Sequence, residues 1–292
     1  MKPAEFDYAR PRDLDEACAM LAEDDARIIA GGQTLVPLMA MRLARPKRLI
    51  DISRIPDLAF VREEGDVVAI GATTRQCVLE HDPLIRVRVA LLSKVMPFVG
   101  HAPTRARGTV GGSLANADPA AEIALVAVTL GATLVYRDGN ATGELAAADF
   151  FVGPMTTALP ATGCLTAVRF PCWRDARIGV GFREVNARRS DFAFAAAAAQ
   201  IAVDDDGVCR RAAVGIGAVT PCPLRLDTVA KALEGTRAEE DVAREAVRLA
   251  LAEVEPLSDL HASAAYRRRA AATLAVRAIN DAYHSAGGAH AR

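Results

Sequence analysis

Two glycine pairs are the residues whose type and spacing suggest chemistry. Gly31-Gly32 follow a short apolar run, and Gly111-Gly112 follow Thr109. Glycine has no Cβ, so the backbone N–H groups of such a loop can approach an anion closely. A helix that starts after the loop adds the positive end of its dipole. Taken alone, each pair fits an ordinary strand–turn–helix connection at least as well, because neither matches GxGxxG or a Walker loop.

The shared pattern of the two loops favours a dinucleotide ligand. Each glycine pair is followed by a small polar stretch, with Thr34 after the first pair and Ser113 after the second. Two loops that both present bare backbone donors fit a diphosphate better than two unrelated turns. Asp118 and Glu122 follow the second loop closely. We therefore expect a dinucleotide with a central pyrophosphate.

Hydrophobic patterning supplies the elements that must position these loops. Strands are expected at Arg27–Ala30, Arg48–Ile52, Val67–Gly71, Ala132–Tyr136 and Cys164–Phe170. Helices are expected over 13–25, 84–100 and Glu122–Leu130, and the Arg- and Gly-rich stretch 101–113 is predicted to be a loop. These elements form a first domain, predicted at residues 1–175.

The pattern changes after about residue 178. Phe192–Asp204 and Val208–Ile216 are predicted strands of a hairpin, and helices follow near 225–234, 238–254 and Ala264–Tyr283. The arginines of the last helix, including Arg267, fit either a partner-facing or a solvated surface. The predicted fold class is α+β, with a smaller C-terminal α+β domain (antiparallel sheet plus helices) at 178–285 and a tail at 286–292.

Composition and cysteine spacing narrow the function classes. The chain of 292 residues is 51% hydrophobic and 24% charged, with a net charge of -1, which gives no reason to expect nucleic acid as a partner. The acidic start lacks a secretory apolar stretch, and the apolar run from Phe192 to Val203 is too short for a membrane span, so a cytoplasmic location is expected. The six cysteines include no CxxC pair, and we expect buried thiols rather than a metal site.

Longer strings around the glycine pairs resemble one family. AGGQTLVPLMAMRLARPKRLIDISRI and RGTVGGSLANADPAAE resemble the two flavin loops of the medium subunits of xanthine dehydrogenase and aerobic carbon monoxide dehydrogenase. FFVGPMTTALPATGCLTAVRFP, FREVNARRSDFAFAAAAA and DLHASAAYRR resemble the segments that follow in that family. The resemblance covers nearly the whole chain in order. It implies a two-part FAD-binding domain of the PCMH (vanillyl-alcohol-oxidase-like) type.

The resemblance also implies which residues contact FAD. They comprise the first loop, the second loop and five further positions: Ala30, Gly31, Gly32, Gln33, Thr34, Leu35; Thr109, Gly111, Gly112, Ser113; Asn116, Asp118, Glu122, Leu165 and Arg183. Arg183 stands where the family usually has Lys, and Ala106 stands where it often has Asn. No catalytic side chain is expected, because the flavin carries the reaction. His101 fits a loop-structuring role better than an acid–base role. The 184–191 loop fits a flavin gate and an ordinary charged loop equally.

The resemblance further implies a division of labour between subunits. A large subunit would carry a molybdopterin cofactor and a small one two two-iron, two-sulfur clusters, in a dimer of heterotrimers. FAD, held non-covalently in this chain, would pass electrons to NAD, oxygen, a quinone or another acceptor. The substrate stays open between carbon monoxide, a purine, an N-heterocycle and an aldehyde. Two alternatives are a stand-alone flavin oxidoreductase of the same fold and a flavin-free assembly scaffold, the latter disfavoured by the intact glycine pairs.

Overall fold

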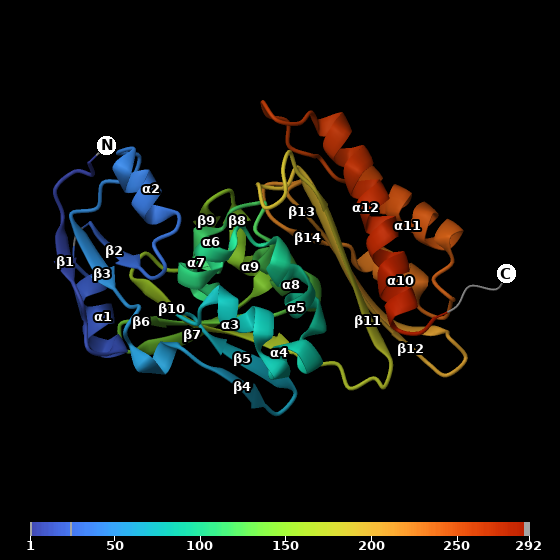
Figure 1. The fold of residues 1–292 in the computed structure, drawn as a ribbon, viewed down its shortest axis with the longest axis horizontal. Coiled ribbons are helices and arrows are strands. Elements are labelled where there is room, and N and C mark those ends of the chain that lie inside the picture. Colours follow the sequence, from blue (N-terminus) through green and yellow to red (C-terminus); the bar gives the residue numbers. More distant parts are fainter. Residues whose placement is uncertain (1, 24, 289–292) are drawn as a thin grey trace.

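The chain begins with a small parallel sheet, shown at the N-terminal end of the molecule in Figure 1. The structure is a computed structural model that describes residues 2–23 and 25–288. The strand order is β1-β3-β2, with all pairs parallel, and the bounds are β1 (Asp7–Ala9), β3 (Arg48–Asp51) and β2 (Ala26–Ile29). Helices α1 (Leu14–Leu21) and α2 (Leu35–Ala40) make the crossovers that parallel pairing requires.

A five-stranded antiparallel sheet follows, in the order β4-β5-β10-β6-β7. Its bounds are β4 (Val61–Glu64), β5 (Val67–Gly71), β10 (Gly163–Pro171), β6 (Thr133–Asp138) and β7 (Ala141–Ala146). The short helix η1 (Pro56–Leu58) precedes this sheet. The helices inserted between its strands are α3 (Gln76–His81), α4 (Pro83–Arg88), α5 (Ala90–Val95), η2 (Met96–Phe98), α6 (Ala102–Arg107), α7 (Val110–Asn116), α8 (Glu122–Leu130) and α9 (Ala147–Phe150). A short hairpin of β8 (Phe151–Gly153) and β9 (Thr156–Thr157) completes this unit.

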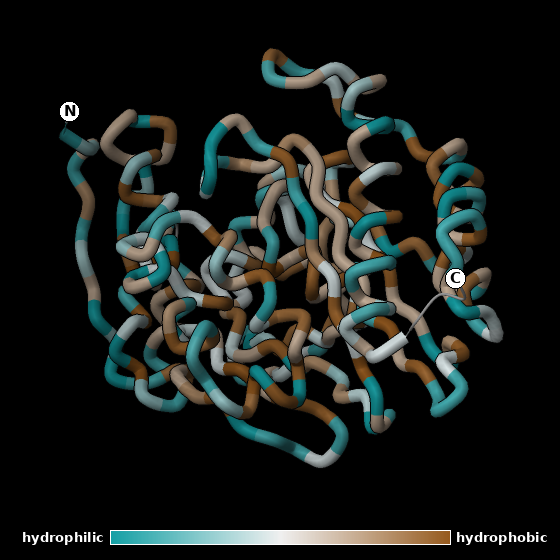
Figure 2. Tube along the Cα trace, turned by 45° about the vertical axis from the view of Figure 1, so that its right-hand side comes forward, coloured by the Kyte–Doolittle hydropathy of each residue, from teal (hydrophilic) through white to brown (hydrophobic). Residues whose placement is uncertain are grey.

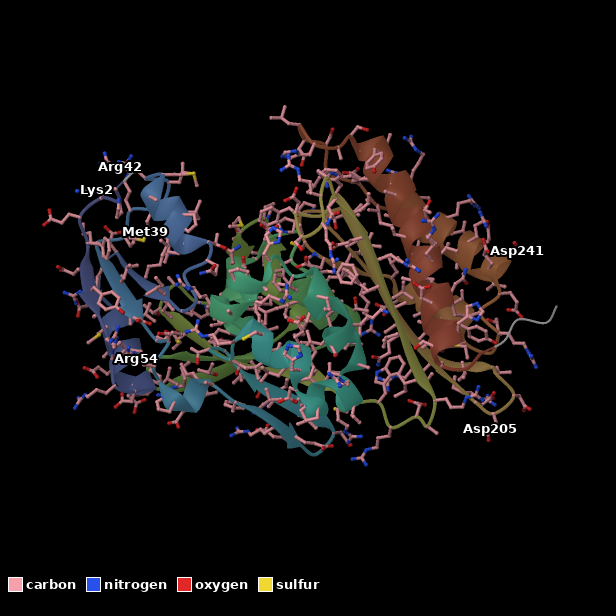
Figure 3. The ribbon with its side chains drawn as sticks, in the orientation of Figure 1. Lys2, Met39, Arg42, Arg54, Asp205 and Asp241 are labelled. Atoms are coloured by element: carbon pink, nitrogen blue, oxygen red, sulfur yellow. The ribbon has the colours of Figure 1, made fainter. Side chains whose placement is uncertain are left out.

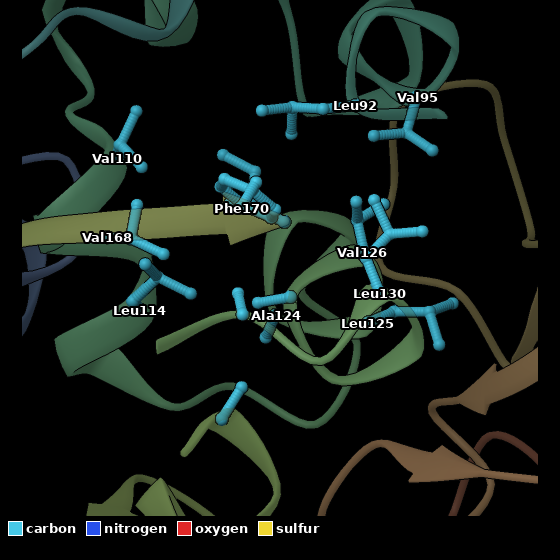
Figure 4. Packing of buried hydrophobic residues seen from close by; sticks show 14 of the residues in the cluster. Leu92, Val95, Val110, Leu114, Ala124, Leu125, Val126, Leu130, Val168 and Phe170 are labelled. Atoms are coloured by element: carbon cyan, nitrogen blue, oxygen red, sulfur yellow. The ribbon is translucent and has the colours of Figure 1, made fainter. Parts of the chain in front are cut away.

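Helix α8 is the centre of the core. Every residue from Ile123 to Leu130 is buried, and a helix that is apolar on all sides must be covered on all sides. Figure 4 shows Ala124 of α8 near Val168 and Phe170 of β10, with Val110 and Leu114 of α7 packed beside them. The predicted helix Glu122–Leu130 is confirmed. The partly buried Glu122, which follows the second glycine loop in the sequence, is the first residue of this helix.

The C-terminal unit is an antiparallel sheet in the order β11-β12-β13-β14 with helices on its outer face. The bounds are β11 (Ile178–Val185), β12 (Ala195–Val203), β13 (Cys209–Gly217), β14 (Leu224–Arg225), α10 (Asp227–Leu233), α11 (Glu240–Ala252) and α12 (Ala264–Ser285). The predicted hairpin and three helices are confirmed. Strand β11 was not predicted, because Gly179 and Gly181 weaken the strand signal. A Cβ on Gly181 would stand 1.9 Å from the Ala278 carbonyl oxygen of α12.

Alternate residues of this sheet pack against different halves of the molecule. Ala196 and Ala198 belong to the core around α8, whereas Ala195, Ala197 and Ala199 belong to the core beneath α12. Successive strand residues point to opposite faces, and here both faces are covered. In Figure 1 the sheet lies between the α5 and α8 side and the α10 to α12 side. In Figure 2 the outer helices at the right show hydrophilic and hydrophobic residues in alternation, as expected of helices that bury one face.

Arg267 and the start of the predicted tail are both held by hydrogen bonds that the sequence did not indicate. Arg267 is buried and donates to the carbonyl oxygens of Phe194 (2.6 Å) and Ala218 (2.7 Å), so it ties α12 to the sheet rather than facing solvent or a partner. In the predicted tail, the carbonyl of Ala286 accepts from Arg177 Nε at 3.2 Å; residues 289–292 lie outside the described residues. Within the described chain no helix is long and apolar enough to cross a membrane.

Candidate dinucleotide-binding site

The first glycine loop leaves four backbone donors unused. Strand β2 ends at Ile29 and α2 begins at Leu35. Gly32 makes the turn at φ +66°, a conformation that glycine adopts without strain. Gln33 Nε2 donates to the Gly31 carbonyl at 3.1 Å and braces the loop. In the described chain the N–H groups of residues 31–34 donate to no protein acceptor, as an anion-binding turn requires.

The flanks of the first loop fix its position. Ala30 packs against the small core beneath α1. Thr34 stands at the start of α2 but its exposed hydroxyl caps no helix N–H, so this hydroxyl is available to a ligand. Beyond α2, Arg42 Nε donates to the Lys2 carbonyl at 3.3 Å, and Figure 3 shows both at this end of the molecule with Met39.

The second glycine pair lies inside a helix, and the predicted loop over 101–113 is wrong. Helices α6 and α7 occupy this stretch. Thr109 is the N-cap of α7, with its Oγ1 accepting from Gly112 N at 3.1 Å. This cap offsets the poor helix propensity of glycine on which the loop prediction relied. Gly111 N donates to the Ala72 carbonyl at 2.9 Å, and a Cβ on Gly111 would lie 2.5 Å from the Ala72 Cβ.

The two loops are in direct contact through Gly108. A Cβ on Gly31 would stand 2.4 Å from the Arg107 carbonyl oxygen and 2.8 Å from the Gly108 Cα. A Cβ on Gly108 itself would lie 2.5 Å from Gln76 Oε1. Helix α6, which leads to Gly108, is anchored by buried Arg105, whose guanidinium binds Glu80 at 3.0 and 3.2 Å. The glycines thus serve close packing of one loop on the other.

Carboxyl groups follow the second loop at the start of α8. Asp118 Oδ1 accepts from Ala120 N at 2.9 Å, while burial raises the pKa of this carboxyl. Burial raises the pKa of Glu122 to about 8, and the neighbouring charges of Glu184 and Asp118 act in the same direction. Burial therefore outweighs the helix N-terminus, which would favour the ionised form. Glu184 was not predicted as a site residue.

Of the remaining predicted residues, three lie on or beside α7, whereas Arg183 lies apart from it. Asn116 Nδ2 contacts Met155 Sδ at 3.7 Å, and Ser113 is partly exposed on α7. Leu165 is buried in the main core, and the next residue on β10, Thr166, accepts from Ala72 N at 2.8 Å, beside Gly111. Arg183 stands apart. Its guanidinium binds Asp281 of α12 at 2.6 and 3.0 Å, on the far face of β11.

Sequence reasoning missed the residues that support the loops. Gly108 directly precedes the Thr109 motif, but only the packing reveals that two segments meet on it. Ala72 and Gln76 come after β5, about thirty to forty residues before the glycines they contact. The small side chain of Ala72 was the only sequence feature that could have indicated this contact. Glu184 could have been found by counting alternate residues along β11, had that strand been located.

His101, the 184–191 stretch and the cysteines have contacts of their own. His101 is exposed at the start of α6, and its carbonyl accepts from Thr104 N at 2.9 Å. The predicted loop over 184–191 begins two residues later, because Glu184 and Val185 belong to β11. Beyond the strand, Asn186 Nδ2 donates to the Asp191 carbonyl at 3.3 Å. The six cysteines are unpaired. Across residues 2–23 and 25–288, no group of His, Cys, Asp or Glu side chains could hold a metal ion.

The fold and the paired glycine loops define a two-domain flavoprotein with a dinucleotide site. Residues 4–173 match the family model described as FAD binding domain in molybdopterin dehydrogenase, and residues 181–282 match the CO dehydrogenase flavoprotein C-terminal domain. The chain therefore belongs to the family of FAD-binding medium subunits of molybdenum hydroxylases. The resemblance and the predicted fold class are confirmed.

Three comparisons illustrate the relationship. Caffeine dehydrogenase subunit beta of Pseudomonas sp. is 35% identical over 284 residues, 96% of this chain and 95% of that protein. The carbon monoxide dehydrogenase medium chain of Afipia carboxidovorans is 34% identical over 97% of this chain and 98% of its own. A solved structure of carbon monoxide dehydrogenase from Hydrogenophaga pseudoflava, which lacks the Mo-pyranopterin moiety of the molybdenum cofactor, superposes with a TM-score of 0.93 at 31% identity, covering 98% of this chain and 99% of its chain.

Proposed function

We propose that this chain holds FAD non-covalently and acts as the electron outlet of a heteromeric molybdenum hydroxylase. The observation that carries the proposal is the contact between the two glycine loops at Gly31 and Arg107. It brings the unused N–H groups of residues 31–34 and the start of α7 to one place. Backbone donors at helix starts fit a diphosphate. The contact fixes the position of the unused donors of residues 31–34, and backbone donors of this kind suit the diphosphate of the cofactor.

The proposed residue roles follow from placement. Gly31 to Thr34 would bind the diphosphate through backbone N–H groups. Thr109 and Ser113 would contribute hydroxyl groups, because the N–H groups of residues 110–113 already donate within the chain. Asn116, Asp118, Glu122 and Leu165 would line the rest of the cofactor site, whereas Arg183 would contribute nothing directly. FAD, when bound, supplies the redox chemistry, and the chain supplies position, exclusion of water and electrostatics.

The partner assignment rests on the relatives. Their names describe subunits or medium chains of larger dehydrogenases, and the crystallised relative is named with a molybdenum cofactor. We therefore propose a large molybdopterin-binding subunit and a small subunit with two two-iron, two-sulfur clusters as partners, in a dimer of heterotrimers in the cytoplasm. Electrons would enter from the small subunit. The FAD-binding domain would span residues 1–175 and the C-terminal domain 178–285.

Spectroscopy of the purified chain tests the cofactor assignment. The visible absorbance bands of oxidised flavin should appear at about one equivalent per chain and pass into the supernatant on acid precipitation. A colourless chain that takes up no added FAD would overturn the proposal and leave the scaffold alternative. Flavin in the pellet would point to a stand-alone oxidase with covalent FAD.

Co-purification tests the partner assignment. A tag on this chain should recover two further chains, with molybdenum and iron in proportion to flavin. Isolation as a homogeneous single-chain flavoprotein that turns over a substrate unaided would refute the subunit role, while leaving FAD binding intact.

A further inference from the structure

The side chain of Gln76 is buried at the junction of the two glycine loops. Only 5% of it is exposed, although glutamine mostly lies on protein surfaces. A Cβ on Gly108 would lie 2.5 Å from Gln76 Oε1 and 2.9 Å from Gln76 Cδ, so the side-chain amide packs directly on Gly108. Gly31 contacts the same residue, since a Cβ on Gly31 would stand 2.8 Å from the Gly108 Cα. The amide and the first glycine loop therefore meet on a residue that has no side chain to separate them.

Backbone hydrogen bonds hold the main chain of Gln76 against the second loop. Gln76 N donates to the Gly108 carbonyl at 3.0 Å, and Val110 N donates to the Thr74 carbonyl at 3.0 Å. These two bonds join the segment before α3 to the segment that introduces α7. The fold itself therefore places the Gln76 side chain at this junction.

The carbonyl oxygen of this side chain has no hydrogen-bond partner. Oε1 of Gln76 is buried and receives no hydrogen bond from any group of the described chain. Buried polar atoms are nearly always paired, and an unpaired one destabilises the fold. A methionine side chain would fill a similar volume without an unpaired oxygen. Because an amide oxygen only accepts hydrogen bonds, the partner that Gln76 lacks is a donor.

The proposed cofactor has donors next to the group that the first loop binds. The diphosphate of FAD only accepts hydrogen bonds, and it suits the unused N–H groups of residues 31–34. The ribityl and ribose units on either side of the diphosphate carry hydroxyl groups, which donate. The chemistry of Gln76 Oε1 therefore matches a sugar hydroxyl and not the diphosphate.

We propose that Gln76 is a further cofactor-binding residue, whose side-chain carbonyl accepts a hydrogen bond from a sugar hydroxyl of FAD beside the diphosphate. The inference rests on the proposed function, in which the first glycine loop binds that diphosphate. It predicts effects of opposite sign, because the unpaired oxygen destabilises the cofactor-free chain and is paired in the complex. Removal of the oxygen relieves the free chain and weakens FAD binding. A purely structural residue would lower stability and affinity together.

The test compares full-length wild type with Gln76→Met after both are freed of flavin. The melting temperature of the cofactor-free variant should equal or exceed that of wild type. Its dissociation constant for FAD, measured by flavin fluorescence, should rise about fivefold, as expected for the loss of one hydrogen bond. Gln200→Met is the matched control, because Gln200 of β12 is also 5% exposed and lies in the C-terminal sheet. Its FAD affinity should stay within about twofold of wild type.

Fragments of the cofactor identify the hydroxyl group. ADP carries the ribose, and FMN carries the ribityl chain. Gln76→Met should weaken the binding of one of these ligands, measured by calorimetry, and leave the other unchanged. An analogue of the affected ligand without sugar hydroxyls, either dideoxy-ADP or a flavin alkyl phosphate, should bind wild type and variant equally. A structural role for Gln76 would leave the difference between the two proteins in place.

Three results would contradict this inference or its basis. A Gln76→Met chain that binds FAD as tightly as wild type overturns the role of Gln76 and leaves FAD binding established. Wild type that binds no FAD refutes the proposed function itself. The wild-type chain also gives a measurement that needs no variant to fold, since one hydroxyl-free analogue should bind about fivefold more weakly than its parent ligand. Equal affinities for both pairs of ligands overturn the proposal.

Discussion

Gly31 lies so close to Arg107 that a Cβ on Gly31 would stand 2.4 Å from the Arg107 carbonyl oxygen. The contact joins a turn of the N-terminal parallel sheet to the residues that introduce α7. The Arg75 guanidinium also donates to this carbonyl, so the oxygen belongs to a backbone held from two sides. Position 31 therefore requires glycine because two segments of the same chain pack together there, in addition to any approach of the cofactor.

Replacing Gly31 with Ala should therefore separate the two loops. The clash involves backbone atoms that no side-chain rotation can relieve, and overpacking of this kind costs about 1–3 kcal/mol. We expect FAD affinity to fall by about tenfold or more, with a lower melting temperature, measured by fluorescence titration and thermal unfolding. Gly153→Ala is the matched control, since its nearest atom, the Thr156 Cβ, is 3.9 Å away. Unchanged affinity in Gly31→Ala would show that the loops need not touch.

Gly111 offers a test by compensation. Its added Cβ would meet the Ala72 Cβ at 2.5 Å, so Gly111→Ala should reduce both stability and FAD binding. Ala72→Gly removes the closest of the clashing atoms. The double variant should therefore recover part of the loss, because the Ala72 Cα and O remain 2.8 Å away. A double-mutant cycle of melting temperatures measures the coupling, and strictly additive effects would contradict the contact.

Thr109 fixes the start of α7 through its hydroxyl. Its Oγ1 accepts from Gly112 N at 3.1 Å, and loss of such a cap costs about 1 kcal/mol. Thr109→Val should lower the melting temperature by about 2–4 °C and weaken FAD binding, as thermal unfolding and titration will measure. Thr109→Ser retains the hydroxyl and should stay close to wild type. A Ser variant as weak as the Val variant would mean that the methyl group, and not the cap, matters.

Much of the fold was predictable, because local signals agreed with tertiary structure. Helix α8 is uniformly apolar, and the strands on either side of the 204–207 turn carry long apolar runs. The prediction for residues 101–113 was wrong because the glycines of this stretch suggest a loop. Thr109 and the contact of Gly111 with Ala72 override that propensity. Strand β11 was not predicted because the close approach of α12, about a hundred residues away, requires the glycines that weaken its strand pattern.

For the site, sequence located the loops but not their supports. The glycine pairs were visible as a repeated pattern, whereas the dependence of Gly31 on Gly108 exists only in three dimensions. The family resemblance implied Arg183 as a cofactor contact. The alternation of β11 turns Arg183 to Asp281 and places Glu184 on the face of α8 instead. The cofactor contact implied for Arg183 stays a prediction, and the placement of its guanidinium on the α12 face argues against it.

Arg183→Met tests that reassignment. The guanidinium is half-exposed and its ion pair with Asp281 lies on the α12 face. Exposed pairs contribute about 0–1 kcal/mol, so we expect a small fall in melting temperature. FAD affinity should change by less than about twofold in titrations of wild type and variant side by side. A loss of tenfold or more would restore the role that the resemblance implied.

Glu122 should make the stability of the chain depend on pH. Its pKa is raised to about 8 in the folded chain, against about 4.3 when unfolded. The folded state therefore binds the proton more tightly, and this contribution is complete below about pH 4.3 and is lost as pH rises toward 8. Glu122→Gln carries no such proton. Its melting temperature should rise relative to wild type between about pH 6 and pH 9.

The size of that relative shift follows from the partial exposure of Glu122. The pKa difference is discounted for solvent to about 2 kcal/mol, and each kcal/mol moves the melting temperature by about 2–4 °C, so the expected gain is about 4–8 °C. The measurement is thermal unfolding of the apo-chain in matched buffers, with Glu245→Gln on α11 as the exposed control. A constant difference between Glu122→Gln and wild type at every pH would mean that Glu122 is ionised throughout, and that burial at the start of α8 does not govern its charge.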